Sequence, residues 1–401
     1  MEMTGTTPAA LEAYERSLQA LWTMSGDARA QAEASVRVAP GFVAGHELIA
    51  SLLLYSRDKR AAKRGERVLA ELRQLPMNER ERAHVAALRL AADGDLGGAR
   101  AVYDALLTDS PRDMLALWAA QVIDYYFGDP HTLRARIERV LPAWPESTPG
   151  RHAVLAMHAF GLEESGDYEA AEAAARAALT LEPRDLRALH ALFHVFEMQS
   201  RPQAGIRYAS ARKAALPNHL WWHTALFHMQ LGRMDRALDV YDQRLKFEDI
   251  DDLIDASSLL WRLQLGGVDV GTRFAALAER WAPFAEDAFC AFNDVHAMMA
   301  FASARRWTLA ESLLAAQSRR IARGWGINND MTKLVGLPAS RALQAFMRGQ
   351  PARAEALLRG LPPVAHRLGG SHAQRDVLQL TRAAAAVAAR QSRFLSNRVA
   401  A

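Results

Sequence analysis

Cysteine is almost absent from this sequence: Cys290 is the only one among 401 residues. A single cysteine excludes an intramolecular disulfide and a zinc site built from thiolates. Apolar runs are also short, and none approaches the roughly 18 residues of a membrane-spanning helix. The first residues show neither a basic start nor the apolar segment of a signal peptide. We therefore expect a cytoplasmic protein with no membrane partner.

Strong charge and phosphate-binding glycine motifs are missing as well. Lys and Arg number 49 against 45 for Asp and Glu, and no basic run is interleaved with aromatic residues. We therefore expect no nucleic-acid partner. The sequence contains neither a glycine-rich nucleotide loop nor the G-x-S-x-G turn of serine hydrolases. It identifies no cofactor beyond a candidate divalent metal ion, whose ligands are considered below.

The composition that is present favours helices. Half of the residues are hydrophobic and 23% are charged, which is the balance of a globular protein. Alanine-rich segments such as AEAAARAAL and TRAAAAVAAR favour α-helix, and few segments alternate as strands do. A single compact core would usually divide at this length, so we expect several domains or a linear array of repeats.

A repeat of about 34 residues is visible in the middle of the chain. Pro183 and Pro217 are 34 residues apart (217 − 183 = 34), and Gly166 and Gly232 are 66 apart (232 − 166 = 66), close to two periods. Small residues let two antiparallel helices approach closely, and proline ends the second helix. This pattern is typical of tetratricopeptide repeats. We predict an all-α, tetratricopeptide-type α-solenoid, a right-handed superhelix of antiparallel helix pairs.

No long linker or low-complexity segment interrupts the pattern. We therefore predict one α-solenoid domain over residues 1–401, with roughly 14 to 18 helices. Within it, residues 1–79 form N-terminal helices, residues 80–250 the clearest repeats, and residues 251–401 divergent repeats and closing helices. The segment GWGINND, Gly324–Asp330, is predicted to be a loop.

Four histidines occur in two pairs within Leu186–Leu231. His190 and His194 are four residues apart, as are His219 and His223, so each pair lies on one face of a predicted helix. In a tetratricopeptide unit this first helix lines the concave face. Neighbouring first helices pack about 8–10 Å apart, so we expect the imidazoles to converge on one cavity.

Carboxylates accompany the histidines at matching positions. Glu197 follows His194 by three residues and joins its face, and Glu163 takes the equivalent position in the preceding repeat. Two imidazoles and a carboxylate can bind one divalent metal ion and leave a coordination position open. Without a metal, a carboxylate can orient one imidazole as a general base. The alternatives are a polar groove that binds a peptide, or buried histidines that donate to backbone carbonyls.

Two later segments also carry polar residues that packing does not require. NDVHAMMAF contributes Asp294 and His296, although Asp294 could simply cap a helix. GGSHAQRD contributes His372 and Arg375 at a helix start, where exposed N–H groups favour an anion. Ser371 as an ordinary cap, with Arg375 and Asp376 as a structural ion pair, is the alternative. Trp222 could wall the cavity or pack in the core.

Five segments resemble the tetratricopeptide repeat protein 38 family: AFGLEESGDY, HALFHVFEMQSR, HLWWHTALFHMQLG, NDVHAMMAFA and GGSHAQRDV. They extend from about residue 150 to 385, with weaker similarity on either side. The resemblance implies a superhelix of helical hairpins and implies no settled reaction. The family often has histidine where this chain has Gln121, so one imidazole of the family pattern is absent here.

We predict a site that binds a small molecule, with an anionic group held by Arg375, and acts on it by metal-assisted or acid–base chemistry. The predicted catalytic residues are His190, His194, Glu197, His223 and His296. The predicted substrate-binding residues are Glu163, His219, Trp222, Asp294, His372 and Arg375. The predicted metal ligands are His190, His194 and Glu197. The alternative function is a non-enzymatic scaffold whose concave groove binds a peptide or protein partner.

Overall fold

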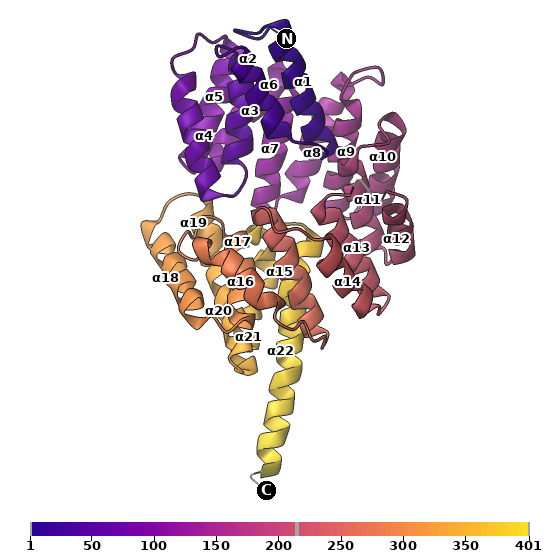
Figure 1. Ribbon diagram of the computed structural model, residues 1–401, viewed down its shortest axis with the longest axis vertical. Helices are drawn as coiled ribbons and strands as arrows, with labels where there is room; N and C mark the ends of the chain where they lie inside the picture. Colours follow the sequence, from indigo (N-terminus) through magenta and orange to yellow (C-terminus); the bar gives the residue numbers. More distant parts are fainter. Residues whose placement is uncertain (1, 213–215, 400–401) are drawn as a thin grey trace. The chain divides into compact units, whose positions relative to one another are not determined.

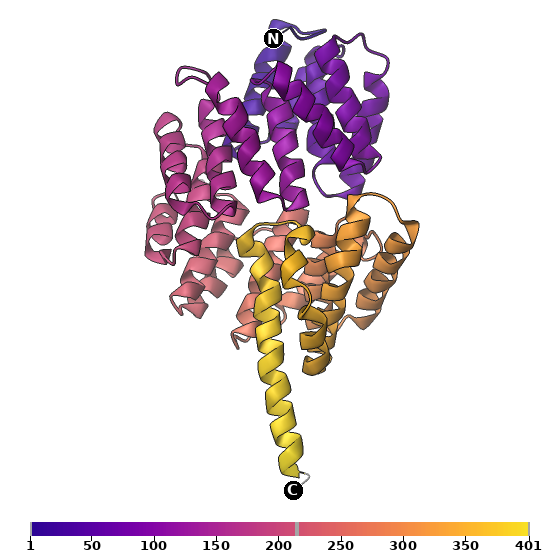
Figure 2. The same cartoon turned by 180° about the vertical axis from the view of Figure 1, so that it is seen from behind.

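The computed structural model describes residues 2–212 and 216–399, and all regular secondary structure in these residues is helical. They form 22 α-helices, more than the roughly 14 to 18 expected. The chain divides into two compact units, Met1–Gln199 and Ser200–Ala401 (Figures 1 and 2). The single-domain organisation over residues 1–401 stays a prediction.

The first unit is a series of antiparallel helix pairs, each packed on the next. The pairs are α1/α2, α3/α4, α5/α6, α7/α8 and α9/α10, and α11 follows against α9 and α10. Their bounds are α1 Pro8–Thr23, α2 Ala28–Val38, α3 Val43–Leu54, α4 Lys59–Leu72, α5 Glu79–Ala92, α6 Leu96–Asp109, α7 Met114–Phe127, α8 Pro130–Val140, α9 Arg151–Glu164, α10 Tyr168–Leu181 and α11 Leu186–Met198. This arrangement confirms the predicted all-α fold of tetratricopeptide-type helix pairs.

The second unit continues with paired helices and closes on one long helix. The pairs α13/α14, α15/α16, α17/α18 and α20/α21 are in contact, and α22 packs on α15 and α21. The bounds are α12 Pro202–Ser210, α13 Asn218–Gln230, α14 Met234–Arg244, α15 Ile250–Leu265, α16 Arg273–Trp281, α17 Ala291–Ser303, α18 Trp307–Arg323, α19 Ile327–Met331, α20 Leu337–Met347, α21 Pro351–Leu358 and α22 His372–Val399.

Polar side chains start many of these helices. The carboxylates of Asp113, Asp185 and Asp249 accept hydrogen bonds from the backbone N–H three residues on, at the starts of α7, α11 and α15. Asn78 and Glu81 form a reciprocal capping box at the start of α5. Each cap satisfies N–H groups that have no partner within the helix, which fixes where the helix begins.

Glycines permit the tight turns and the close approach of paired helices. Gly166 and Gly232 occupy the predicted hairpin turns with φ of +81° and +70°, a region that favours glycine. In α9, a Cβ on Gly161 would lie 2.9 Å from the Cα of Arg134 in α8. The absence of a side chain at Gly161 therefore sets how closely α8 and α9 pack.

Each unit has its own large apolar core. Phe42 and Tyr103 are fully buried in the core of the first unit. Trp222, Trp261 and Trp281 are fully buried in that of the second. Trp222 therefore contributes to this core, and its predicted part in substrate binding stays a prediction. Among the described helices, none combines the length and apolar character needed to cross a bilayer.

The prediction that Gly324–Asp330 is a loop is wrong in its second half. α19 begins at Ile327 and passes through a π-helical turn, Thr332–Gly336, into α20. Side-chain hydrogen bonds hold this segment: Asn328 accepts from the backbone N–H of Ala291, and Asn329 donates to the carbonyls that end α18. Ala291 is 37 residues from Asn328, so the local pattern did not reveal this support for the helix.

Helix α22 is the last and longest element described. Its first half packs in the second unit, where Val377, Leu378 and Thr381 are buried. Its second half extends beyond α20 and α21, as both views show (Figures 1 and 2). The start of α22 holds the predicted GGSHAQRD residues and therefore enters the candidate site.

Candidate functional site

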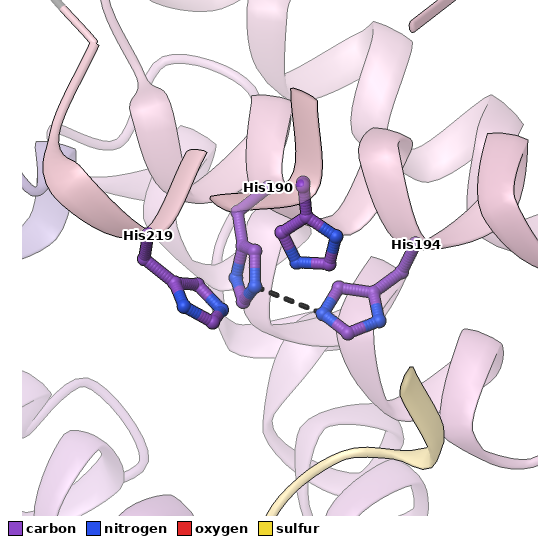
Figure 3. Close-up of side chains that lie close together, drawn as sticks. His190, His194 and His219 are labelled. Carbon is purple, nitrogen blue, oxygen red and sulfur yellow. Dashed lines mark hydrogen bonds between the residues drawn. The ribbon is translucent and has the colours of Figure 1, made fainter. Parts of the chain in front are cut away.

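The first pair of histidines lies on α11, as the sequence predicted. The Nε2 atoms of His190 and His194 are 2.9 Å apart and share a hydrogen bond (Figure 3). His194 is fully buried, whereas His190 is partly buried. Spacing on the helix face brings both imidazoles to one point, with the Nε2 atoms facing each other.

Two side chains of α9 surround this pair. Glu163 is fully buried, and its Oε2 lies 3.8 Å from Nδ1 of His194, so the carboxylate stands behind the ring. The Phe160 ring stacks on His190 and meets His194 edge-on, with ring centroids 5.8 Å and 5.5 Å apart. Glu197 lies on the last turn of α11 and is partly buried. The first unit therefore assembles four of the predicted site residues on α9 and α11.

Two other buried His–Asp pairs in this unit have a structural role. His152 donates from Nδ1 to Asp185 at 2.7 Å, and Asp185 also caps α11. His84 donates from Nε2 to Asp113 at 2.9 Å, and Asp113 caps α7. In both pairs the histidine of one hairpin fixes the aspartate that starts a later first helix. A buried His–Asp pair whose aspartate also caps a helix is therefore explained by the fold alone.

That further pair lies in the second unit and differs from the other two. Nδ1 of His219, on α13, lies 2.9 Å and 3.0 Å from the two carboxylate oxygens of Asp255, on α15. Asp255 is buried in the middle of its helix, and the cap of α15 is Asp249. Asp255 therefore has no capping role, and its contact with His219 needs another explanation.

The rings of α13 pack tightly around this pair. The imidazole of His219 stacks on the indole of Trp222, with centroids 5.2 Å apart and an interplanar angle of 11°. His223 is fully buried and meets both rings edge-on. Burial, with the nearby charges of His219 and Arg262, holds the pKa of His223 well below its usual value. The imidazole of His223 is therefore neutral at pH 7.

Arg262 connects α13 to the start of α22. Its guanidinium lies over the Trp222 ring, 5.4 Å from the centroid, and is buried. It donates to the carbonyl oxygen of Ala373 at 2.7 Å, and also to Ser258 Oγ and to the carboxylate of Asp376. One side chain thus joins helices α13, α15 and α22, which are far apart in sequence.

The GGSHAQRD segment reaches this network, but not through all the predicted residues. Arg375 donates to the carbonyl of Gly370, and His372 is exposed. The Ser371 side chain does not cap α22, because its buried Oγ has no hydrogen-bond partner among the described residues. The ion pair of Asp376 is with Arg262.

The two predicted site residues of α17, Asp294 and His296, lie in different surroundings. His296 is fully buried, donates from Nδ1 to the carbonyl of Phe292 at 2.8 Å, and packs on the Phe292 ring. Phe292 in turn packs on Gly370, where a Cβ would lie 2.5 Å from the ring. Asp294 instead accepts a hydrogen bond from Gln317 of α18 at 3.3 Å, and Cys290 takes the cap position. Burial raises the pKa of Asp294 to about 7.

The structure adds two residues that the sequence reasoning missed, Asp255 and Arg262. Both stand in the otherwise apolar segment LIDASSLLWRLQL, seven residues apart and hence on one face of α15. A charged residue inside an apolar helix was the available signal. The expectation that the two pairs of histidines share one cavity stays a prediction, because α11 belongs to the first unit and α13 to the second.

Comparisons with known proteins add only general information. No family model matches the chain. The crystal structure of the APC/C hetero-tetramer Cut9-Hcn1 is similar at 12% identity, over 93% of this chain and 76% of that chain, with a TM-score of 0.40. The structure of Naa15/Naa10 bound to HypK-THB is similar at 14% identity, over 96% of this chain and 63% of that chain, with a TM-score of 0.28. The assignment of tetratricopeptide-type pairs therefore rests on the helices themselves.

Proposed function

We propose that the second unit carries a small-molecule site in which His219, oriented by Asp255, transfers a proton. The observation that supports this proposal is the His219–Asp255 contact in a position without a capping role. A carboxylate that accepts from Nδ1 fixes the tautomer, so that Nε2 is the basic nitrogen. The carboxylate also stabilises the imidazolium that forms when Nε2 takes a proton.

The surroundings of His219 suit this chemistry. The indole face of Trp222 favours a cation stacked on it. The neutral His223 ring beside it can exchange a hydrogen bond without adding a positive charge. Arg375 and His372, at the start of α22, are the candidates for binding an anionic group of the substrate, because a helix start favours negative charge.

The test is a comparison of metabolite profiles. A pool of small metabolites is incubated with the wild-type protein, with Asp255→Asn and with Asp185→Asn, and then followed by mass spectrometry. Asp185→Asn is the matched control, because it alters a buried His–Asp pair that caps a helix. We expect at least one compound to be converted by the wild type and the control but not by Asp255→Asn.

His219→Gln should give the same loss as Asp255→Asn, and circular dichroism shows whether each variant is folded. If all proteins convert the same compounds, or none does, the acid–base proposal is wrong. That outcome would favour the alternative of a scaffold that binds a peptide or protein partner in its groove.

A metal ion at His190 and His194 is the second candidate function. The two Nε2 atoms face each other at 2.9 Å, close to the about 3.3 Å that two zinc–nitrogen bonds require at a tetrahedral angle. Glu163 stands behind His194 on the Nδ1 side, where a carboxylate commonly orients a metal-binding imidazole. Glu197 is the predicted third ligand. A bound ion would supply a Lewis acid at this point.

Metal analysis of the purified protein, followed by Zn²⁺ titration, tests this second candidate. His190→Ala and His194→Ala should each weaken Zn²⁺ binding by at least about tenfold, because loss of only a supporting partner of a ligand already costs that much. His131→Ala, which removes an exposed imidazole on α8, is the control and should leave the affinity unchanged. Equal affinity in all four proteins would remove the metal from consideration.

We also propose that the chain belongs to the tetratricopeptide repeat protein 38 family. The five segments that carry the resemblance supply residues of α9, α11, α13, α17 and α22, which hold the candidate site residues. These five segments therefore carry the polar side chains of the candidate sites as well as the residues that pack the repeats.

A further inference from the structure

Glu47, on α3, is a fully buried carboxyl group far along the chain from the histidine-rich helices. Neither of its side-chain oxygens has a hydrogen-bond partner among the described residues. An ionised carboxylate in this position would lose its hydration without hydrogen bonds to replace it, which is costly. The neutral, protonated carboxyl is therefore the form that suits the folded first unit.

The groups that face Glu47 come from three other parts of the same unit. Tyr14 lies on α1, Arg80 and His84 lie on α5, and Asp113 precedes α7. Asp113 already accepts from Nε2 of His84 at 2.9 Å, from Arg80 at 2.8 Å and from the backbone N–H of Ala116 at 3.1 Å. Its charge is thus balanced without Glu47.

Glu81, the remaining carboxylate near Glu47, is also occupied. Its two oxygens accept from the backbone N–H groups of Thr4 and Asn78, at 2.8 Å and 3.0 Å. The cluster therefore contains two satisfied carboxylates, Asp113 and Glu81, and one that is not, Glu47. In the described part of the chain, Nδ1 of His84 is likewise without a hydrogen-bond partner.

These surroundings set the titration of Glu47. Burial raises its pKa to about 7; His84 and Arg80 oppose the rise, while Asp113 and Glu81 add to it. Burial lowers the pKa of His84, but the charges of Asp113 and Glu47 outweigh it and leave that pKa raised. The pKa of the buried Tyr14 phenol is raised, so it stays protonated at neutral pH.

We propose that Glu47 is a proton-binding site within the first unit, protonated below neutral pH and ionised above it, and that ionisation loosens the packing of α3 against α5. The sign follows from linkage. A folded-state pKa above the unfolded value contributes stability that is complete below about 4.5 and is lost as the pH rises through about 7. The raised pKa of His84 acts in the same direction.

Asp113 does not disturb this window. Its pKa is lowered: burial acts to raise it, but His84 and Arg80 outweigh that effect. A lowered carboxyl pKa gives stability that is lost only in acid, well below the range in which Glu47 titrates. From pH 5 to 8 the first unit should therefore become progressively less stable, by up to on the order of 100-fold in the unfolding equilibrium constant.

Carbon-13 NMR on the full chain, labelled at Glu Cδ, observes the titration directly. We expect a glutamate signal with a midpoint near 7 that is absent from Glu47→Gln. Aspartate carboxyls carry no label, so Asp294 in the second unit does not interfere. A spectrum in which no glutamate titrates above about pH 6 overturns the proposal, whether or not the variant folds.

Hydrogen exchange supplies the second measurement. In the wild type, the amides of α3 and α5 should lose protection between pH 6 and pH 8, after correction for the intrinsic pH dependence of exchange. Glu47→Gln, which carries a permanently neutral group, should reduce this loss severalfold. His152→Gln alters a buried His–Asp pair without such a carboxyl and should keep the wild-type dependence. An unchanged dependence in Glu47→Gln overturns the coupling between the proton and the packing.

Discussion

Nδ1 of His219 lies 2.9 Å from Oδ1 of Asp255 and 3.0 Å from Oδ2, so one N–H is shared by both oxygens of a buried carboxylate. His152 makes a similar contact with Asp185, but there the carboxylate also caps α11. The His152–Asp185 pair therefore helps to fix the start of a helix. The His219–Asp255 pair holds an imidazole in place but caps no helix.

This difference predicts unequal effects on stability. Asp185→Ala should lower the free energy of unfolding by roughly 2 kcal/mol or more, because it removes a cap and leaves His152 without its acceptor. Asp255→Ala should cost less, about 1 kcal/mol, because it removes no helix cap and its partner His219 is partly exposed. Urea unfolding, followed by hydrogen exchange in α11 and α15, measures both. A larger loss for Asp255→Ala would mean that both pairs are structural.

The buried imidazole of His223 predicts an effect in acid. A histidine pKa below its unfolded value of 6.5 gives stability that is complete above about 6.5 and is lost as the pH falls. In nitrogen-15 NMR, His223 should therefore stay neutral as the pH falls below 6.5.

His223→Gln should reduce the loss of second-unit stability between pH 6.5 and pH 5, since no imidazole then has to stay uncharged. A His223 signal that titrates near the ordinary histidine pKa of 6.5 would show that burial does not hold this ring neutral.

Much of the fold could be predicted from the sequence, because repeat spacing is local information. The period of 34 residues placed His190 and His194 on a first helix, and glycine with φ above zero occupies the predicted turns at Gly166 and Gly232. The partners of the site residues could not be predicted in this way. Asp255 is 36 residues from His219 and meets it only through helix packing.

The directions of the side chains on α17 could not be predicted from the repeat spacing either. Asp294 and His296 are two residues apart, so they point to different sides of α17. One contacts Gln317 and the other the carbonyl of Phe292. The sequence placed both in one site, and only the packing of neighbouring helices separates their surroundings.

Gly370 should be the most sensitive glycine at the start of α22. Its φ is +81°, and a Cβ would lie 2.5 Å from the Phe292 ring, so Gly370→Ala adds both backbone strain and a clash. We expect a loss of roughly 2 to 4 kcal/mol. Gly267→Ala is the control, because φ is +80° there but nothing lies within 4 Å. Equal midpoints in urea unfolding would exclude close packing of Gly370 on Phe292.

Arg262 should control the attachment of α22 to the second unit. Its guanidinium donates to Ser258, Ala373 and Asp376, and a single lysine ammonium cannot reproduce this planar arrangement. Arg262→Lys should therefore raise the hydrogen-exchange rate at the start of α22 by about tenfold or more, as expected when about 1.4 kcal/mol of local stability is lost. Arg244→Lys, which changes a guanidinium over the Trp221 ring, is the control and should leave α22 unchanged. If Arg262→Lys also leaves it unchanged, packing alone holds α22, and Arg262 is only a buried charge paired with Asp376.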